Sequence, residues 1–185
     1  NDANVAALGE MWKGAGHGEK NMVMVTLGTG VGGGVIMGGR PLIGANGAGG
    51  EIGHICVNYF EEKCCGCGKK GCLEQYASAT GIARIAREHL AADKKDSILR
   101  TYDWDKIDAK IVFDALKEGD LLAVDVVEEF GEYLAKGLAD VAVVVDPSLF
   151  VIGGGVSKAG EILLDYIKPY YQKYAFSACK DAAFA

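Results

Sequence analysis

The fold is decided by residues 22–37, which read MVMVTLGTGVGGGVIM. Two runs rich in apolar residues, 22–27 and 31–37, flank a short turn from Gly28 to Gly30, and this pattern predicts an antiparallel hairpin. The same stretch contains the G-x-G-x-x-G pattern of dinucleotide-binding Rossmann units. A Rossmann fingerprint opens a helix, whereas this chain continues as a strand, so we reject that fold. The glycines are therefore expected at the tip of a hairpin.

The hairpin tip has the chemistry of a phosphate site. Backbone amides without neighbouring side chains, together with the hydroxyls of two threonines, can hold phosphate oxygens. The alternative is an ordinary glycine turn without a ligand. We expect phosphate contacts at Thr26, Gly28, Thr29 and Gly30.

The chain before the hairpin predicts a short helix. Small polar residues at Asn1, Asp2 and Asn4 precede an apolar helical pattern that Gly14 ends. Asp2 lies at the start of this helix, where the positive end of the helix dipole favours an ionised carboxylate. Asp2 can therefore act as a base, although a simple helix cap is the alternative.

Helices and one further strand follow the hairpin. A short strand at 41–43 precedes a glycine-rich, irregular stretch at 44–53, and the polar stretch 91–108 is expected to be partly loop. Period-3.6 patterns predict the helices and a short apolar run predicts a buried strand. The expected helices are 73–77, 80–90, 111–119, 120–145 with Asp120 as cap, and 158–171, and the strand is 150–152. This order predicts one mixed α/β domain.

The composition excludes several classes of function. The chain has 185 residues, half of them apolar, which suits one domain with a sizeable core. The net charge of −6 comes without a basic block, so no nucleic-acid partner is expected. No run of about 18 apolar residues and no secretion signal is present, so no membrane association is expected.

Five of the six cysteines lie between positions 56 and 72. Such clustering indicates a metal site in a reducing compartment, which we take to be the cytoplasm, rather than disulfides. Three thiolates and one imidazole suit tetrahedral Zn²⁺, and the glycines between the cysteines let the backbone wrap the ion. The alternatives are buried thiols or disulfide partners, and Cys64 in place of Cys65, because Cys64 and Cys67 form a C-x-x-C pair. The expected ligands are His54, Cys65, Cys67 and Cys72.

Polar groups flank this metal set. Glu51 and His54 lie in the sequence GEIGH, in a loop that cannot bury them as core, and Glu74 follows Cys72 at a predicted helix start. If zinc binds one ring nitrogen of His54, the other can make a hydrogen bond. Carboxylates and imidazole in a glycine-lined cleft suit a polyhydroxyl ligand such as a sugar. The alternative for Glu74 is a solvated acid in the first helical turn.

Gly153, Gly154 and Gly155 follow the predicted buried strand. In α/β sheets, ligands bind at the carboxyl ends of strands, and backbone without side chains lets a flat ring approach. We therefore expect nucleotide contacts here. The alternative is a turn that needs glycine for its geometry alone.

Together these motifs resemble the ROK family (repressors, open reading frames, kinases), and in order and spacing they resemble its sugar kinases. The resemblance covers almost the whole chain. It implies the actin/hexokinase-like (ribonuclease H-like) ATPase fold, with a mixed sheet, flanking helices and a zinc-binding loop at 54–72. The motifs are Asn1-Asp2-Ala3-Asn4, the hairpin, Gly50 to His54, C-x-C-G-x-x-G-C-x-E and Val151 to Gly155.

The resemblance also implies a role for each candidate residue. Asp2 is the expected catalytic base for the sugar 6-hydroxyl, while Mg²⁺ spans the phosphates of ATP. The remaining sugar hydroxyls are expected to be bound by Asn1, Glu51, His54 and Glu74. The second phosphate loop is expected at Gly28 to Gly30, and the adenosine contact at Gly153 to Gly155. The expected zinc ligands are His54, Cys65, Cys67 and Cys72.

The family's first phosphate loop, Asp-x-Gly-Gly-Thr, does not occur in residues 1–185. The resemblance therefore implies a truncated C-terminal lobe with little activity by itself, in a protein that converts glucose and ATP to glucose 6-phosphate and ADP and forms a homodimer. Two alternatives stay open. One is the sugar-sensing domain of a ROK repressor, preceded by a helix-turn-helix, and the other is a kinase for fructose, mannose or an N-acetylated amino sugar. Asp2 together with the glycine hairpin favours a kinase.

Overall fold

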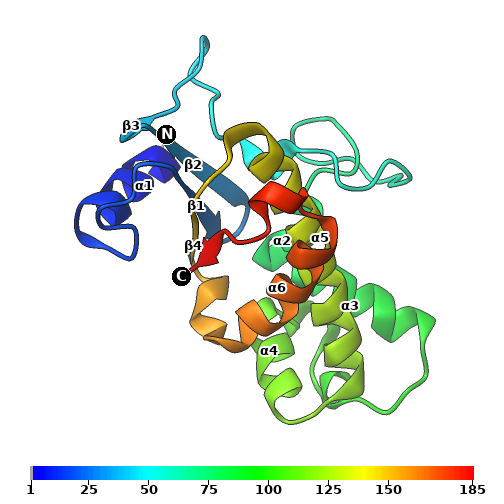
Figure 1. Cartoon of the computed structure of the whole chain (residues 1–185). Helices are drawn as coiled ribbons and strands as arrows, with labels where there is room; N and C mark the ends of the chain where they lie inside the picture. Colours follow the sequence, from blue (N-terminus) through cyan, green and yellow to red (C-terminus); the bar gives the residue numbers. More distant parts are fainter. Residues whose placement is uncertain (1) are drawn as a thin grey trace.

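A mixed sheet forms the centre of the molecule in the computed structural model, which describes residues 2–185. Its strand order is β3-β2-β1-β4-β5 (Figure 1). Strands β1 (Met22–Leu27) and β2 (Val31–Met37) form the predicted antiparallel hairpin, and β4 (Leu149–Gly153) pairs with β1 in parallel. The edges are short: β3 (Arg40–Pro41) beside β2 and β5 (Ala183–Phe184) beside β4.

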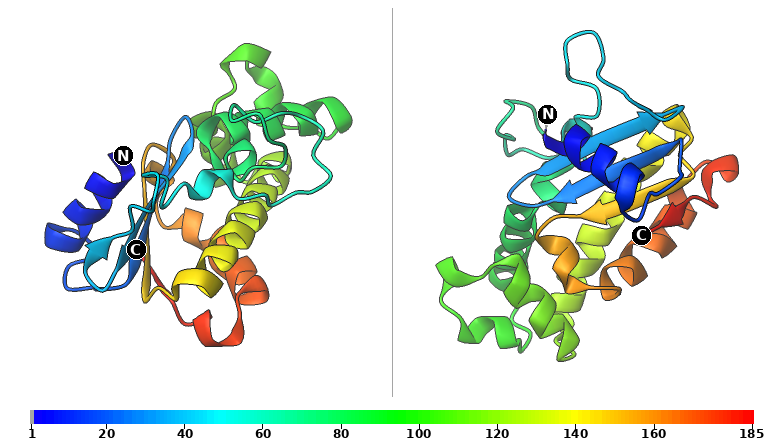
Figure 2. Two further views of the ribbon diagram at one scale, coloured as in Figure 1. Left: turned by 90° about the horizontal axis from the view of Figure 1, so that it is seen from above. Right: turned by 90° about the vertical axis from the view of Figure 1, so that its left-hand side faces the viewer.

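Helices cover both faces of the sheet, as Figure 2 shows. Helix α1 (Asp2–Lys13) lies on one face, and the other helices gather on the opposite face. These are α2 (Glu74–Ala77), α3 (Ala79–Ala92), α4 (Ala109–Lys117), α5 (Leu121–Val145) and α6 (Ile162–Tyr174). The predicted mixed α/β domain is confirmed. Among residues 2–185, no helix has both the length and the apolar character needed to cross a membrane.

Both faces of β1 are buried, which explains its almost continuous apolar sequence. Alternate residues point to opposite faces. Val23 and Val25 belong to the large core beneath α3 to α6, whereas Met22 and Met24 pack with Ala7 of α1 in a smaller core.

The glycines of β2 allow two segments to press directly on its backbone. A Cβ atom on Gly34 would lie 2.6 Å from the Cβ atom of Ala7 in α1. On the opposite face, a Cβ atom on Gly33 would lie 2.7 Å from Cγ1 of Ile52. Glycine in a strand marks such close approaches. The first turn of α1 and the loop that contains Glu51 are thereby held on either side of one strand.

Asp120 caps the long helix α5 as predicted, and its side chain is buried rather than solvated. Its carboxylate accepts hydrogen bonds from the Ala123 amide at 2.9 Å and from the Ser97 hydroxyl at 2.9 Å, and only 7% of Asp120 is exposed. The cap therefore also anchors the segment before α4.

Two local predictions were wrong, and one strand was missed. The third strand is Arg40–Pro41 rather than 41–43. The last helix does not begin at Lys158, because a 3-10 turn, η4 (Val156–Ala159), ends at Gly160, whose φ of 90° breaks the helix. Strand β5 was not expected at all. The remaining 3-10 turns are η1 (Ile52–His54), η2 (Ile98–Thr101), η3 (Trp104–Lys106) and η5 (Ser177–Cys179).

Candidate functional site

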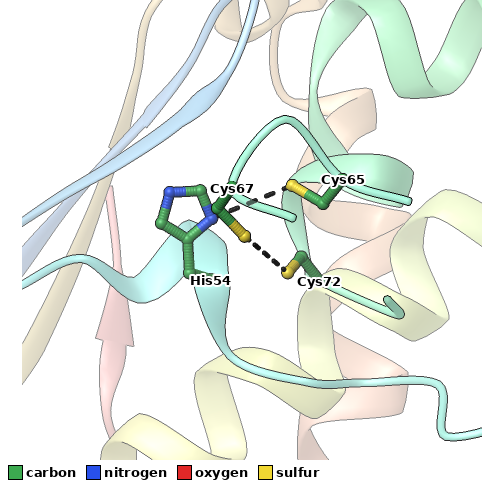
Figure 3. Close-up of side chains that lie close together, drawn as sticks. All are labelled: His54, Cys65, Cys67 and Cys72. Atoms are coloured by element: carbon green, nitrogen blue, oxygen red, sulfur yellow. Dashed lines mark hydrogen bonds between the residues drawn. The ribbon is translucent and has the colours of Figure 1, made fainter. Parts of the chain in front are cut away.

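One imidazole and three thiols converge in the loop that precedes α2 (Figure 3). The Sγ atoms of Cys67 and Cys72 are 3.6 Å apart, and Sγ of Cys65 lies 3.9 Å from Nδ1 of His54. All four donor atoms lie within 4.8 Å of one another. A tetrahedron with metal–sulfur bonds of about 2.3 Å has edges of about 3.8 Å. The predicted set therefore has the spacing that a tetrahedral Zn²⁺ requires.

Glycines shape this loop. Gly68 and Gly71 have φ angles of +85° and +73°, in the left-handed region that L side chains rarely adopt. Between them the chain reverses, and the Cys65 amide donates to the Lys69 carbonyl at 2.7 Å. This reversal brings Cys72 back beside Cys67, so a local turn forms the cluster.

The electrostatics of the cluster favour a bound cation. Burial, with the neighbouring thiols of Cys67 and Cys65, raises the pKa of Cys72 to about 12. The backbone amide of Lys69 lowers the pKa of Cys67. A metal ion among the sulfurs stabilises their thiolate forms, which a buried site otherwise disfavours.

The alternative assignments receive no geometric support. All six cysteines have free thiols, so the disulfide alternative is not seen. Cys64 is exposed and lies outside the cluster, whereas Cys65 is buried within it. Cys179 is buried, whereas Cys56 is half-buried, and neither belongs to the cluster.

Glu74 connects the metal cluster to the hairpin. Its Oε2 accepts a hydrogen bond from the Val31 amide at 3.0 Å, and its Oε1 accepts from the Cys65 thiol at 3.8 Å. A Cβ atom on Gly30 would overlap Oε2 of Glu74, so a side chain there would displace this carboxylate. Glu74 is half-buried and therefore is not simply a solvated acid of the first turn.

His54 ends the 3-10 turn η1, and Glu51 is the cap residue just before that turn. Nδ1 of His54 faces Cys65, and its second ring nitrogen points away from the thiols (Figure 3). The His54 amide donates to the Glu51 carbonyl at 3.1 Å, and the Glu51 side chain is exposed. A metal on Nδ1 would fix the ring and leave the second nitrogen for a ligand.

At the hairpin tip, every carbonyl is used and two amides are left over. The Gly28 carbonyl accepts from the Ala79 amide at 2.7 Å, and the Thr29 carbonyl accepts from the Thr80 hydroxyl at 2.9 Å. The Gly30 carbonyl accepts from the Gly28 amide at 3.0 Å. Among residues 2–185, no acceptor is found for the amides of Thr29 and Gly30. Backbone donors without protein acceptors, at an exposed turn, can donate to a bound anion.

A cavity of about 340 Å³ opens beside the tip. Ala79, whose amide holds Gly28, lines one side, and Gly155 lines another. Its remaining walls come from α4 and η4 and include Phe113, Val156, Lys110, Lys117 and Lys158. This volume falls in the usual range for small-molecule sites. The sequence predicted only the glycine wall, because nothing in the α4 pattern distinguishes a cavity-lining helix from a core helix.

Gly153, Gly154 and Gly155, at the carboxyl end of β4, have different surroundings. Only Gly155 lines the cavity. A Cβ atom on Gly154 would lie 2.7 Å from the Leu27 amide nitrogen, and one on Gly153 would lie 2.5 Å from Cε of Met24. Gly154 is therefore needed for packing against the backbone of β1, whether or not it also contacts a ligand, whereas Gly153 meets only the flexible end of the Met24 side chain.

Asp2 is exposed in the first turn of α1, as predicted. Asn1, its expected companion, lies outside the described residues. Thr26 lies away from the tip: a Cβ atom on Gly32 would lie 2.5 Å from Oγ1 of Thr26 and 3.4 Å from Cβ of Ala3. The Thr26 hydroxyl is therefore on the face of β1 that α1 covers, near the start of that helix.

Comparison with known proteins gives a consistent result. Residues 1–184 match the ROK family. The glucokinase of Halalkalibacterium halodurans is 51% identical over 184 residues, which are 99% of this chain and 56% of that protein. The crystal structure of a ROK family glucokinase from Streptomyces griseus in complex with glucose and AMPPNP matches with a TM-score of 0.90 and 39% identity, over 100% of this chain and 61% of the other. A ROK family transcriptional regulator, a homologue of the E. coli MLC protein, matches with a TM-score of 0.88 and 32% identity, over 99% of this chain and 45% of the other.

This chain spans just over half the length of the curated glucokinase that it matches. The predicted actin/hexokinase-like fold is confirmed by the S. griseus structure. With the family match extending from residue 1 to residue 184, the chain belongs to the ROK family.

Proposed function

We propose that the full-length protein containing this chain is an ATP-dependent glucokinase that forms glucose 6-phosphate and ADP. The observation that carries the proposal is the hairpin tip, where two amides without acceptors lie between the metal cluster and the cavity. Relatives named glucokinase, and the S. griseus enzyme with glucose and AMPPNP, support it.

The nucleotide is assigned to the cavity and the hairpin tip together. The apolar walls from Phe113 and Val156, with the bare backbone of Gly155, suit a nucleobase. Because Ala79 both lines the cavity and holds Gly28, phosphates leaving the cavity meet the amides of Thr29 and Gly30. Mg²⁺ bound with the nucleotide supplies charge neutralisation during phosphoryl transfer.

The sugar is assigned to the groups around the metal cluster. Glu51, the second nitrogen of His54 and Glu74 offer acceptors for ring hydroxyls, and the family resemblance adds Asn1 as a further sugar-binding candidate. Zn²⁺ held by His54, Cys65, Cys67 and Cys72 is proposed as structural, because all four positions of a tetrahedral site are filled by protein atoms. Zinc thus fixes the direction of the His54 ring.

Asp2 is proposed as the base that accepts the proton of the sugar 6-hydroxyl as it attacks the γ-phosphate. Phosphoryl transfer of this kind depends on positioning and electrostatic stabilisation more than on covalent chemistry. The packing of α1 on Gly34 of β2 supports the assignment, since it holds the Asp2 turn on the strand that continues from the tip.

We further propose that residues 1–185 are the C-terminal lobe of the enzyme, with the zinc loop at 54–72, and that this lobe alone has little activity. A homodimer in the cytoplasm, where thiols stay reduced, is proposed for the full-length protein. The second candidate is the sugar-sensing domain of a repressor, favoured by the similarity to a ROK transcriptional regulator. A sensor needs neither a base at Asp2 nor free amides at the tip.

A coupled assay of ADP release tests the proposal on the full-length protein with glucose, fructose, mannose and N-acetylglucosamine. We expect turnover with glucose and a loss of at least about 100-fold in kcat for Asp2→Asn, because general base catalysis contributes that much. Asp105→Asn, at an exposed acid on η3, is the matched control and should match the parent. No turnover with any hexose would contradict the kinase, and an Asp2→Asn variant within threefold of the parent would contradict the assigned base.

A further inference from the structure

Two peptide planes at the hairpin tip are each held from behind. The Gly28 carbonyl and the Thr29 amide belong to one planar peptide unit, and the Thr29 carbonyl and the Gly30 amide belong to the next. In a trans peptide the carbonyl and the amide point in opposite directions. The Ala79 amide binds the first carbonyl at 2.7 Å and the Thr80 hydroxyl binds the second at 2.9 Å. The two free amides therefore point away from α3, outward from the tip.

The Thr80 hydroxyl has one proton, and its direction can be deduced. The Thr29 carbonyl only accepts, so Thr80 donates to it. Oγ of Ser78 lies 2.9 Å from Oγ1 of Thr80, and Ser78 must then be the donor of that bond. Ser78 also accepts from the Gly81 amide at 2.9 Å as the cap of α3. A chain of hydrogen bonds therefore connects the Gly81 amide, Ser78, Thr80 and the Thr29 carbonyl.

Because of the glycines beside Thr29, the peptide after Thr29 needs a bond that holds its orientation. Thr29 has a glycine on each side, Gly28 and Gly30. The peptide between Thr29 and Gly30 therefore has few steric limits on rotation. If it turned over, a carbonyl oxygen would face the ligand in place of an amide, and an anion would be repelled. The bond from Thr80 removes that freedom.

We propose that Thr80 is a positioning residue for the phosphates of the nucleotide. Its hydroxyl fixes the Thr29–Gly30 peptide so that the Gly30 amide faces the phosphate, and the Ala79 amide does the same for the preceding peptide. Thr80 acts through the backbone of the tip and does not touch the sugar groups. This inference rests on the proposed function, because it needs a phosphate ligand at the tip.

Thr80→Val, which keeps the shape and removes the hydroxyl, tests the proposal in the full-length protein. We expect a five- to tenfold higher dissociation constant for MgADP by calorimetry and a similar rise in KM for ATP, with KM for glucose within twofold of the parent. Hydrogen exchange of the segment containing Gly30 should become faster. Thr80→Ser keeps the donor and should return all values to within twofold.

Ser78→Ala separates positioning from stability. It removes the cap of α3 and should lower the melting temperature, yet it leaves the bond from Thr80 to Thr29, so the affinity for MgADP should stay within twofold. An unchanged affinity in Thr80→Val, or a loss in Ser78→Ala as large as in Thr80→Val, would overturn the proposal. A parent protein that binds no nucleotide would instead overturn the proposed function.

Discussion

Replacing Gly34 by alanine should damage both stability and catalysis through one contact. The new Cβ atom would lie 2.6 Å from Cβ of Ala7 and would also overlap the Ala3 carbonyl. Carbon atoms in contact are about 3.5–4.0 Å apart, so α1 must move outward by about 1 Å. Overpacking of this size costs about 1–3 kcal/mol. A displacement of about 1 Å at a reacting group can cost about 100-fold in rate, and Asp2 lies on the displaced turn.

The measurement is made on the full-length protein, by urea unfolding and by kcat with saturating glucose and ATP. Gly9→Ala is the matched control, because Gly9 lies on the exposed side of α1 and a Cβ atom there has no neighbour within 4 Å. Alanine in place of glycine within a helix should stabilise by about 0.5–1 kcal/mol. If Gly34→Ala unfolded at the parent's urea concentration, the packing of α1 on β2 would be refuted. If it were destabilised but kept the parent's kcat, the role of Asp2 would be refuted instead.

Two further outcomes follow from the metal cluster and from a tyrosine on α6. Cys72→Ser should reduce bound zinc from about one per chain to below about 0.1 by elemental analysis, since a buried ligand is lost. The control Cys64→Ser should keep the metal. Equal zinc in both variants would contradict the assigned ligand set. The Tyr170 hydroxyl donates to Glu128 at 2.8 Å, and this bond, with burial, raises the pKa of Tyr170 to about 12, above its ordinary value of 10.0. The folded protein therefore keeps a proton that the unfolded chain loses above about pH 10, so this stabilisation is complete below pH 10 and disappears as the pH rises to about 12. Urea unfolding at pH 9, 10 and 11 should show a smaller decline in Tyr170→Phe than in the parent, and parallel declines would contradict the assignment.

The sequence was sufficient for features that depend on neighbouring residues. The hairpin was predicted because two runs rich in apolar residues are adjacent in the chain, with a short glycine turn between them. The metal cluster was predicted because its ligands occupy one short segment, with glycines where the backbone must reverse. Both features depend only on residues that are close in the sequence, so the sequence pattern was enough to predict them.

Features that join distant segments could not be predicted. Glu74 meets the Val31 amide 43 residues away, and Thr80 meets the Thr29 carbonyl 51 residues away. Neither contact leaves a pattern in the sequence, because many side chains could donate to or accept from a backbone group. Strand β5 has two residues, too few for any periodicity. The α4 wall of the cavity was missed because its exposed and buried positions follow an ordinary amphipathic pattern.

The place of β4 in the sheet has a consequence for synthesis. Ser148, just before β4, binds the carbonyl of Asn21, 127 residues earlier in the chain, at the start of β1. Until β4 emerges, one edge of the apolar strand β1 has no partner. At a synthesis rate of about 5–20 residues per second, that edge of β1 stays unpaired for roughly 6–25 s. Unpaired apolar edges are sites of aggregation, so the nascent chain is exposed to this hazard during that interval.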